Sequence, residues 1–180
     1  MRVVLIAAQS LDGFIAKHAE PGTAFTSAED KAWFPACLAD FDCCVMGSAT
    51  YREARAAIRE QAASSSRRRI ILTRQPAAFA DDAKPGRLEF TAEPPAGLCE
   101  RLHAEGHRHC ALLGGGEING LFLAAGLVDE AWITLEPRIF GEGRPLASGR
   151  LDTRLHLSAT VPLGPDVLLL KYTVARGAAA

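Results

Sequence analysis

The sequence lacks the features of a secreted or disulfide-stabilised protein. Its 180 residues contain five cysteines, an odd number, and no C-x-x-C pair. Small secreted scaffolds pair an even set of cysteines, and zinc ribbons use closely spaced pairs, so neither class is indicated. We expect reduced thiols and a cytoplasmic location.

Long apolar runs and an excess of one charge are also missing. The run that opens the chain, Val3 to Ala8, is short, whereas a membrane-spanning helix needs about 18 or more apolar residues. Asp12-Gly13 follows closely, so we interpret the run as a buried strand rather than as a signal peptide. With 20 basic and 21 acidic residues, the chain offers no broad basic surface for nucleic acid or an anionic membrane.

The sequence does have apolar content and a regular order of elements. Hydrophobic residues make up 48% of the chain, which suits the core of one domain at this length. Short apolar runs predict strands at residues 3–8, 43–46, 69–73, 87–90, 110–113, 130–135, 155–161 and 167–174. Helices are predicted from Ser27 to about residue 38, at 48–61, between Pro95 and Gly106, and at 117–125.

This order predicts the fold class. Strands alternate with helices over most of the chain, which implies a mostly parallel central sheet with helices on both faces. The last two strands, separated by the turn PLGPD, imply a C-terminal antiparallel hairpin. We expect one α/β domain over residues 1–175, with residues 176–180 as a frayed tail.

Two glycine-containing turns suggest a ligand site. Gly114, Gly115 and Gly116 follow one predicted strand, and Gly47 follows another. The carboxyl ends of parallel strands share one sheet edge, where ligands bind. Glycine permits close approach of the backbone, and the first N–H groups of a helix favour an anion. A tight turn without a ligand is the alternative, and the spacing departs from the G-x-G-x-x-G dinucleotide pattern.

Four stretches, in order, resemble the dihydrofolate reductase fold family. They are SLDG (10–13), VMGSATY (45–51), ILTR (71–74) and the segment 112–146, which contains LLGGGEINGLFL and GLVDEAWITLEPRIFGEGRPL. The chain is most similar to the reductase domain of the bifunctional riboflavin-pathway deaminase–reductases and to their single-domain relatives. The resemblance implies a dihydrofolate reductase-like three-layer sandwich and an oxidoreductase that uses NADPH.

The resemblance also implies where the cofactor lies. It places the pyrophosphate at the two glycine-containing turns, the adenosine 2′-phosphate at Thr73 and Arg74, and the nicotinamide against the backbone of Ala8. The cofactor-binding residues expected on this basis are Ala8, Gly47, Ser48, Ala49, Thr50, Thr73, Arg74, Leu113, Gly114, Gly115, Gly116, Glu117 and Ile118. A solvated surface charge is the alternative for Arg74.

Two carboxylates are candidate catalytic groups. The stretch DKAWF (30–34) resembles the acid-bearing helix of dihydrofolate reductase, whose acid helps to protonate a pterin and whose aromatic residue packs against it. Asp30 and Phe34 share a helix face because they are four residues apart, and burial would raise the pKa of Asp30. Asp12 is the second candidate. Both have structural alternatives, Asp30 at a helix start and Asp12 in an Asp-Gly turn.

Two positions depart from the riboflavin-pathway reductases. The basic residue usual after SLDG is replaced by Phe14, and the glutamate usual before the glycine pair is replaced by Leu113. In those enzymes both positions touch the phosphoribosyl substrate, so we expect poor reduction of that intermediate, with Phe14 and Phe34 facing the substrate. The basic run Arg67 to Arg69 precedes its strand, and we expect it to be solvated at the opposite end of the sheet.

The sequence therefore predicts an NADPH-dependent reductase that transfers hydride to a small heterocyclic or imine substrate, such as a pyrimidine or a pterin. A nucleotide-binding or regulatory protein that retains the cofactor site without turnover is the alternative. We expect a homodimer, with the strand at 167–174 at its interface. No metal site is expected, because Gly106 breaks the helix that would align His103 with His107.

Overall fold

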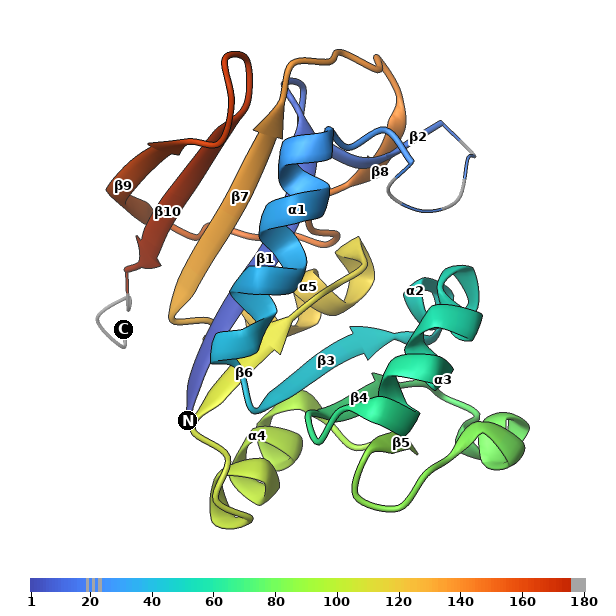
Figure 1. The fold of residues 1–180 in the computed structure, drawn as a ribbon. Coiled ribbons are helices and arrows are strands. Elements are labelled where there is room, and N and C mark those ends of the chain that lie inside the picture. Colours follow the sequence, from blue (N-terminus) through green and yellow to red (C-terminus); the bar gives the residue numbers. More distant parts are fainter. Residues whose placement is uncertain (19, 21, 23, 176–180) are drawn as a thin grey trace.

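The computed structural model describes residues 1–175 except 19, 21 and 23 (Figure 1). The predicted tail, 176–180, lies outside the described residues. Within the described part, eight strands form one sheet in the order β5-β4-β3-β6-β1-β7-β10-β9. Neighbouring strands from β5 to β7 pair in parallel, whereas β10 pairs antiparallel with both β7 and β9. The predicted α/β class and the C-terminal antiparallel pair are confirmed.

The strands are β1 (Arg2–Ser10), β2 (Phe14–Lys17), β3 (Cys43–Gly47), β4 (Arg68–Leu72), β5 (Leu88–Thr91), β6 (His109–Leu112), β7 (Glu130–Glu136), β8 (Gly143–Pro145), β9 (Leu155–Pro162) and β10 (Leu168–Val174). The α-helices are α1 (Ala28–Cys37), α2 (Ser48–Glu53), α3 (Arg55–Ser64), α4 (Pro95–Ala104) and α5 (Gly116–Ala124). Two 3-10 helices are η1 (Leu38–Asp40) and η2 (Pro76–Asp82).

The sheet is covered on both faces because its central strands are apolar throughout. Successive side chains of a strand point to opposite faces. One face packs against α1, α2 and α3, and its core includes Val4, Cys44, Ile71, Cys37, Tyr51 and Ile58. The other face packs against α4 and α5, and its core includes Leu5, Val45, Ile70, Leu98, Leu102 and Phe122. The result is a three-layer sandwich (Figure 1).

Helix α1 begins where the sequence predicts. The Ser27 hydroxyl accepts a hydrogen bond from the backbone N–H of Asp30 at 3.1 Å, which is N-cap geometry. The Ser27 hydroxyl and backbone N–H both donate to Glu136 at the end of β7, each at 3.0 Å. This second contact fixes the start of α1 against the sheet edge.

The predicted helix 48–61 is wrong as a single element. It is two helices, α2 and α3, which meet at Ala54 with φ −112° and ψ 19°. Neither proline nor glycine stands there. The residues on either side of the break, Tyr51 and Arg55, both bind the buried carboxylate of Asp82, at 2.8 and 2.7 Å. Tertiary contacts therefore divide a segment whose local pattern favours one helix.

Two short elements were not predicted from the sequence. Strands β2 and β8 form a separate antiparallel pair, in which Phe14 pairs with Pro145 and Lys17 with Gly143. A Cβ at Gly143 would lie 2.2 Å from the carbonyl oxygen of Ala16, so glycine permits this close pairing. The pair is three or four residues long, too short to give a period-two signal.

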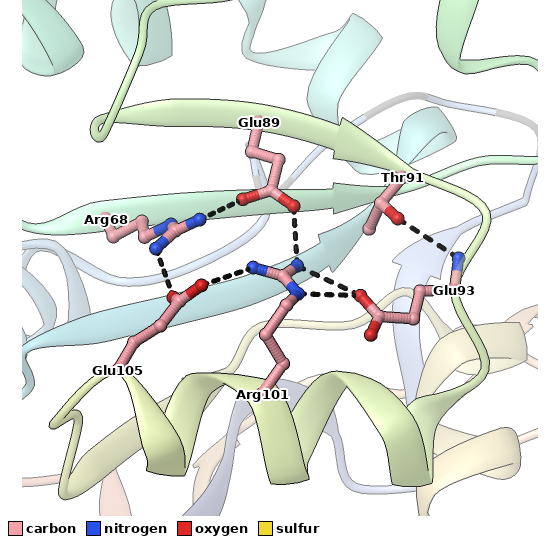
Figure 2. A network of polar contacts seen from close by, with 6 residues as sticks. All are labelled: Arg68, Glu89, Thr91, Glu93, Arg101 and Glu105. Atoms are coloured by element: carbon pink, nitrogen blue, oxygen red, sulfur yellow. Dashed lines mark hydrogen bonds and ion pairs between the residues drawn. The ribbon is translucent and has the colours of Figure 1, made fainter.

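The basic run Arg67 to Arg69 lies at the predicted end of the sheet, but the prediction that it is solvated is wrong. Strand β4 begins at Arg68, so Arg68 and Arg69 point to opposite faces. Arg68 pairs with Glu89 and Glu105 on the α4 face (Figure 2). Arg69 is only 3% exposed and lies on the α1 and α3 face. Neither arginine is a solvated surface charge.

The strand expected at a dimer interface, β10, is not the edge strand of the sheet. Strand β10 lies between β7 and β9, so β9 forms the edge of the sheet. Three large apolar side chains on β9 are exposed: Leu155, Leu157 and Val161. In the described residues, no helix is long and apolar enough to cross a membrane.

Candidate functional site

The two glycine-containing turns touch one another. The backbone N–H of Gly47 donates to the carbonyl oxygen of Gly114 at 2.7 Å. Gly114 has φ +81°, a conformation that other residues adopt at a cost, and the side chain of Asn119 lies against it. The ends of β3 and β6 therefore form one continuous rim at the carboxyl edge of the parallel strands.

Gly115 and Gly116 differ in what lies beside their backbone, and Gly120 resembles Gly116. A Cβ at Gly116 would lie 2.4 Å from the carbonyl oxygen of Pro145, and one at Gly120 would lie 1.9 Å from that of Ser148. These two glycines admit the segment that follows β8, which Ser148 N–H ties to Gly116 O at 2.9 Å. A Cβ at Gly115 meets nothing closer than the Thr50 hydroxyl at 3.6 Å. At Gly115, unlike Gly116, no other segment of the chain fills the space where a side chain would be.

A cavity of about 530 Å³ lies beside this rim, and we call it the cofactor cavity after the predicted cofactor-binding residues that line it. Most of the predicted cofactor-binding residues line it: Gly47, Ser48, Ala49, Thr50, Arg74, Gly115, Gly116, Glu117 and Ile118. Its far wall comes from the segment 92–95 and from Pro145 and Ser148. Thr73 and Gly114 lie at the same edge but are not among its lining residues.

A second cavity of about 290 Å³, the cleft, lies over the sheet on the α1 and α3 face. Its lining includes Ala8, Asp30, Trp33, Phe34, Met46, Ile58 and Leu113. Thr50, Gly115 and Arg144 line both cavities, so the two meet there. The predicted nicotinamide contact, Ala8, and the predicted acid, Asp30, therefore face one space that opens onto the cofactor cavity.

Asp30 is the buried acid of the cleft. It is 8% exposed, and burial raises its pKa, while the neighbouring Thr134 and Thr26 act in the opposite direction. A carboxyl group in such a place holds a proton at higher pH than an exposed one, which suits a general acid. Phe34 lines the same cleft one turn later, as the helical spacing predicts.

The other two predicted side chains lie elsewhere. Asp12 accepts hydrogen bonds from the Ser10 hydroxyl at 2.6 Å and from the backbone N–H of Gly141 at 2.7 Å. These bonds lower its pKa, so the geometry favours its turn interpretation over a proton donor. Phe14 is not among the lining residues of either cavity; the next residue, Ile15, lines the cleft instead.

Arg74 stands at the outer end of the cofactor cavity. Its guanidinium lies 3.3 Å from the Glu117 carboxylate, and the two side chains are 91% and 75% exposed. An ion pair this exposed is worth roughly 0–1 kcal/mol, so a stronger anion can displace it. Thr73 caps the same turn, because its hydroxyl accepts from the N–H of Gln75 at 3.2 Å.

Sequence reasoning missed several residues of the site. Arg144 stands where the two cavities meet, and it pairs with Glu53 at 2.5 Å. Arg67 and Arg69 line the cleft although the sequence suggested solvated charges. A signal for Arg69 was available, since β4 alternates and a side chain two residues before Ile71 shares its buried face.

The histidine-rich stretch before β6 gathers one small polar cluster. The ligand atoms of Asp42, Cys43 and His107 lie within 4.8 Å of one another. Asp42 also accepts the backbone N–H groups of Arg108 at 2.8 Å and His109 at 3.2 Å. Its carboxylate therefore holds the start of β6.

Comparison with known proteins identifies the family of the chain. Residues 2–169 match the RibD C-terminal domain. The chain belongs to that family. It is thus a riboflavin-pathway pyrimidine reductase-like protein with a dihydrofolate reductase-like fold.

Individual relatives agree with the family. The 2,5-diamino-6-ribosylamino-4(3H)-pyrimidinone 5′-phosphate reductase of Methanothermobacter thermautotrophicus is 39% identical over 85 residues, which are 43% of this chain and 39% of that protein. A putative riboflavin biosynthesis protein from Shewanella sp. PV-4 superposes with a TM-score of 0.74 at 22% identity, over 98% of this chain and 100% of that one. Enterococcus faecalis dihydrofolate reductase, solved with NADP(H), gives 0.64 at 15% identity over 97% of each chain.

Proposed function

We propose that the protein is an NADPH-dependent reductase that transfers hydride to a small pyrimidine- or pterin-like heterocycle or imine. The observation that carries the proposal is the junction of the two cavities. One is bordered by bare backbone and the start of α5; the other holds a buried acid and aromatic side chains. Thr50 and Gly115 border both, so two ligands bound side by side would touch there.

The cofactor cavity fits a dinucleotide phosphate. Its inner wall is Gly47 to Thr50 and Gly115 to Ile118, which supply backbone N–H groups with little side-chain bulk. Arg74, at the exposed end of the cavity, would bind the 2′-phosphate, which distinguishes NADPH from NADH. Ala8 and Leu113 would border the nicotinamide at the cleft. When bound, NADPH supplies the hydride.

The chain's own residues would bind the acceptor and hold a proton. Trp33 and Phe34 offer flat apolar surfaces to a ring. Asp30 would hold a proton for the reduced nitrogen or carbon of the acceptor, or bind an amino group on it. Helices α1 and α3, which line the cleft, would shield the bound acceptor and Asp30 from bulk water.

The test is NADPH oxidation by the purified protein across three acceptor classes: ribosylaminopyrimidine 5′-phosphates, dihydropterins and cyclic imines. Oxidation with one class, and NADPH binding tighter than NADH binding, are the expected results. NADPH binding without oxidation of any acceptor would favour the nucleotide-binding alternative. Absence of any NADPH binding would overturn both.

Assembly and location are further parts of the proposal. The exposed apolar residues Leu155, Leu157 and Val161 on edge strand β9 favour pairing of two copies there. Light scattering of the wild type and of Leu157→Lys would test the homodimer, with a monomeric variant as the expected result. All five cysteines are free thiols in the structure, which supports a cytoplasmic location.

A further inference from the structure

The starts of β3 and β6 bring together three side chains of the kinds that bind metal ions. Asp42 and Cys43 stand where β3 begins, and His107 lies in the turn between α4 and β6. Their ligand atoms, a carboxylate oxygen, a thiol sulfur and an imidazole nitrogen, lie within 4.8 Å of one another. The glycine rim follows the other ends of the same two strands, so this cluster and the cofactor cavity lie at opposite edges of the sheet (Figure 1).

The spacing of the three ligand atoms suits one tetrahedral ion. Asp42 Oδ1 and His107 Nδ1 are 3.5 Å apart, which is longer than an ordinary N–H···O hydrogen bond. An oxygen and a nitrogen bound to the same tetrahedral zinc ion lie roughly 3.3–3.4 Å apart, and a thiolate sulfur lies roughly 3.5–3.6 Å from either. Small side-chain rotations would therefore bring all three atoms to bonding distance of a shared ion.

Backbone hydrogen bonds hold two of the three ligands in place. Asp42 Oδ2 accepts the N–H groups of Arg108 at 2.8 Å and His109 at 3.2 Å. Both bonds use Oδ2, so Oδ1 stays directed at His107. The backbone N–H of His107 donates to the carbonyl oxygen of Leu102 at 3.0 Å, which fixes the turn to the end of α4. Contacts of this kind orient the ligands of metal sites in proteins.

Cys43 would supply the sulfur ligand from the inner side. It is buried in the core of the α4 and α5 face, and its thiol donates to the carbonyl oxygen of His109 at 3.8 Å. If a metal ion replaces the thiol proton, that oxygen keeps a partner, because it also accepts the backbone N–H of Asp42 at 3.1 Å. The Asp42 side chain is 41% exposed and that of His107 is 19% exposed. An ion can therefore enter from solvent, and water can complete the coordination.

From this arrangement we infer that Asp42, Cys43 and His107 form a site for a zinc ion. Thiolate, imidazole and carboxylate are the ligands that zinc prefers. The sequence separates His107 from His103 at Gly106, but the partners of His107 come from the start of β3, which only the sheet brings near. The site lies on the α4 face, away from the cleft. It would fasten the turn before β6 to β3, and it does not depend on the proposed reaction.

Metal binding by the purified protein tests the site directly. The protein is treated with EDTA under reducing conditions, the chelator is removed, and Zn²⁺ is added in a calorimetric titration. We expect one ion per chain and a higher melting temperature with Zn²⁺, because an ion that binds only the folded chain stabilises it. Co²⁺ serves as the spectroscopic probe, since a thiolate-to-metal charge-transfer band reports ligation by sulfur.

Four variants assign the ligands. His107→Gln removes the imidazole, and His156→Gln on the exposed edge strand β9 is its matched control. Cys43→Ala removes the thiol, and Cys37→Ala is its control, because that thiol lies on the α1 face. Loss of an outer contact of a ligand weakens metal binding about 10–100-fold, so loss of a ligand should cost at least as much. The Co²⁺ band should vanish in Cys43→Ala, and both controls should bind as the wild type does.

The outcomes decide the inference. Absence of Zn²⁺ and Co²⁺ binding by the wild type overturns it, as does Zn²⁺ binding that is equally tight in His107→Gln. If Cys43→Ala fails to fold, Asp42→Asn takes its place; it keeps an oxygen for the backbone N–H groups and must weaken Zn²⁺ binding at least about tenfold.

A simple contact between His107 and Asp42 has a different signature. In that case His107→Gln would lower the melting temperature of the metal-free protein, and Zn²⁺ would raise the melting temperatures of wild type and variant equally, which overturns the site. NADPH oxidation should persist after EDTA treatment, because the site is remote from the cleft. Loss of oxidation that Zn²⁺ restores would overturn the structural role of the ion, whereas Zn²⁺ binding without any NADPH oxidation would overturn only the proposed reaction.

Discussion

Arg68 and Arg69 are neighbours in the sequence and opposites in their surroundings. Arg68 contacts Glu89 at 2.5 Å and also Glu105, and both glutamates bind Arg101 as well (Figure 2). Arg69 faces the cleft without a carboxylate partner among the described residues. On the α4 face, these arginines are paired with glutamates of the chain. On the α1 and α3 face, Arg69 has no carboxylate partner among the described residues and faces a cavity.

The difference indicates how stability and function are divided. In Figure 2, Arg101 lies between Glu89, Glu93 and Glu105, so that strand β5, its following turn and α4 are connected through one guanidinium. Burial opposes the charged form of Arg101, but these partners outweigh it and raise its pKa. Substitutions on this face should change stability, and substitutions in the cleft should change ligand binding.

The largest effect is expected at Asp30. If the cleft serves catalysis, Asp30→Asn should lower kcat/KM about 100-fold or more, because it removes the general acid. Its raised pKa also predicts that wild-type kcat/KM falls as pH rises through that pKa, a limb that the variant should lack. Burial disfavours the ionised form, so the melting temperature of Asp30→Asn at neutral pH should be equal or higher. If Asp30→Asn is destabilised and its kcat/KM is unchanged, the expected division between a stabilising α4 face and a functional cleft face is contradicted.

The next largest effect is expected at Arg74. Unlike Arg68 and Arg69, this arginine is exposed and forms only an exposed ion pair with Glu117. Arg74→Ala should reduce the preference for NADPH over NADH by roughly tenfold to a hundredfold, since it removes a charge-assisted contact to the 2′-phosphate. Dissociation constants for both cofactors give the measurement. Arg150→Ala, an exposed arginine of the 146–154 segment, is the control. A preference that survives Arg74→Ala would remove Arg74 from the site.

Arg101→Met tests the paired face. It leaves three glutamates close together without their shared cation, and we expect the free energy of unfolding to fall by roughly 1–3 kcal/mol. Urea denaturation measures this change, and NADPH binding should be unaffected. Weaker ligand binding at unchanged stability would show that the network serves the site.

The smallest effect is expected at Asp82. It tests whether the stability effect of a substitution depends on ion pairing or on the face of the sheet that carries the residue. Asp82 lies on the cleft face but is bound by Arg55 at 2.7 Å and by the Tyr51 hydroxyl at 2.8 Å. The hydrogen bond from Arg55 is the main cause of its lowered pKa. Asp82→Asn should therefore cost roughly 1 kcal/mol of unfolding free energy at neutral pH.

The pH dependence gives the sign of that prediction. Because the folded-state pKa is depressed, the stabilising contribution of Asp82 is fully present above the unfolded pKa of about 4. It is lost as pH falls through the folded value. Wild type and Asp82→Asn should differ at pH 7 and converge below about pH 4. A constant difference across this range would contradict the assignment to the carboxylate charge.

Much of the fold follows from local pattern. Apolar runs located the eight strands of the sheet, and the Ser27 cap located α1. Elements that depend on distant partners were missed, such as the β2 and β8 pair, which exists because the segment after β7 returns to the start of the chain. The break at Ala54 belongs to the same class, because the Asp82 carboxylate that holds both sides comes from a later segment.

The candidate site divides in the same way. Turn glycines and the spacing of Asp30 and Phe34 are local features, so the sequence indicated the rim and the acid. Whether Gly116 faces a ligand or another chain segment is not local: Pro145 O occupies that space. The role of Asp12 is not local either. Its carboxylate fixes a loop because the backbone N–H groups of Phe140 and Gly141 donate hydrogen bonds to it.

By itself, the sequence determined the class of fold, the shared edge of the glycine turns and the helix that carries Asp30, because short-range periodicity and capping depend on neighbouring residues. The tertiary structure decided which charges are satisfied. Arg68 finds glutamates from β5 and the end of α4, and Arg69 finds an open cleft. Partners that are distant in the sequence are brought together only by packing, and burial sets the strength of the electrostatic interactions between them.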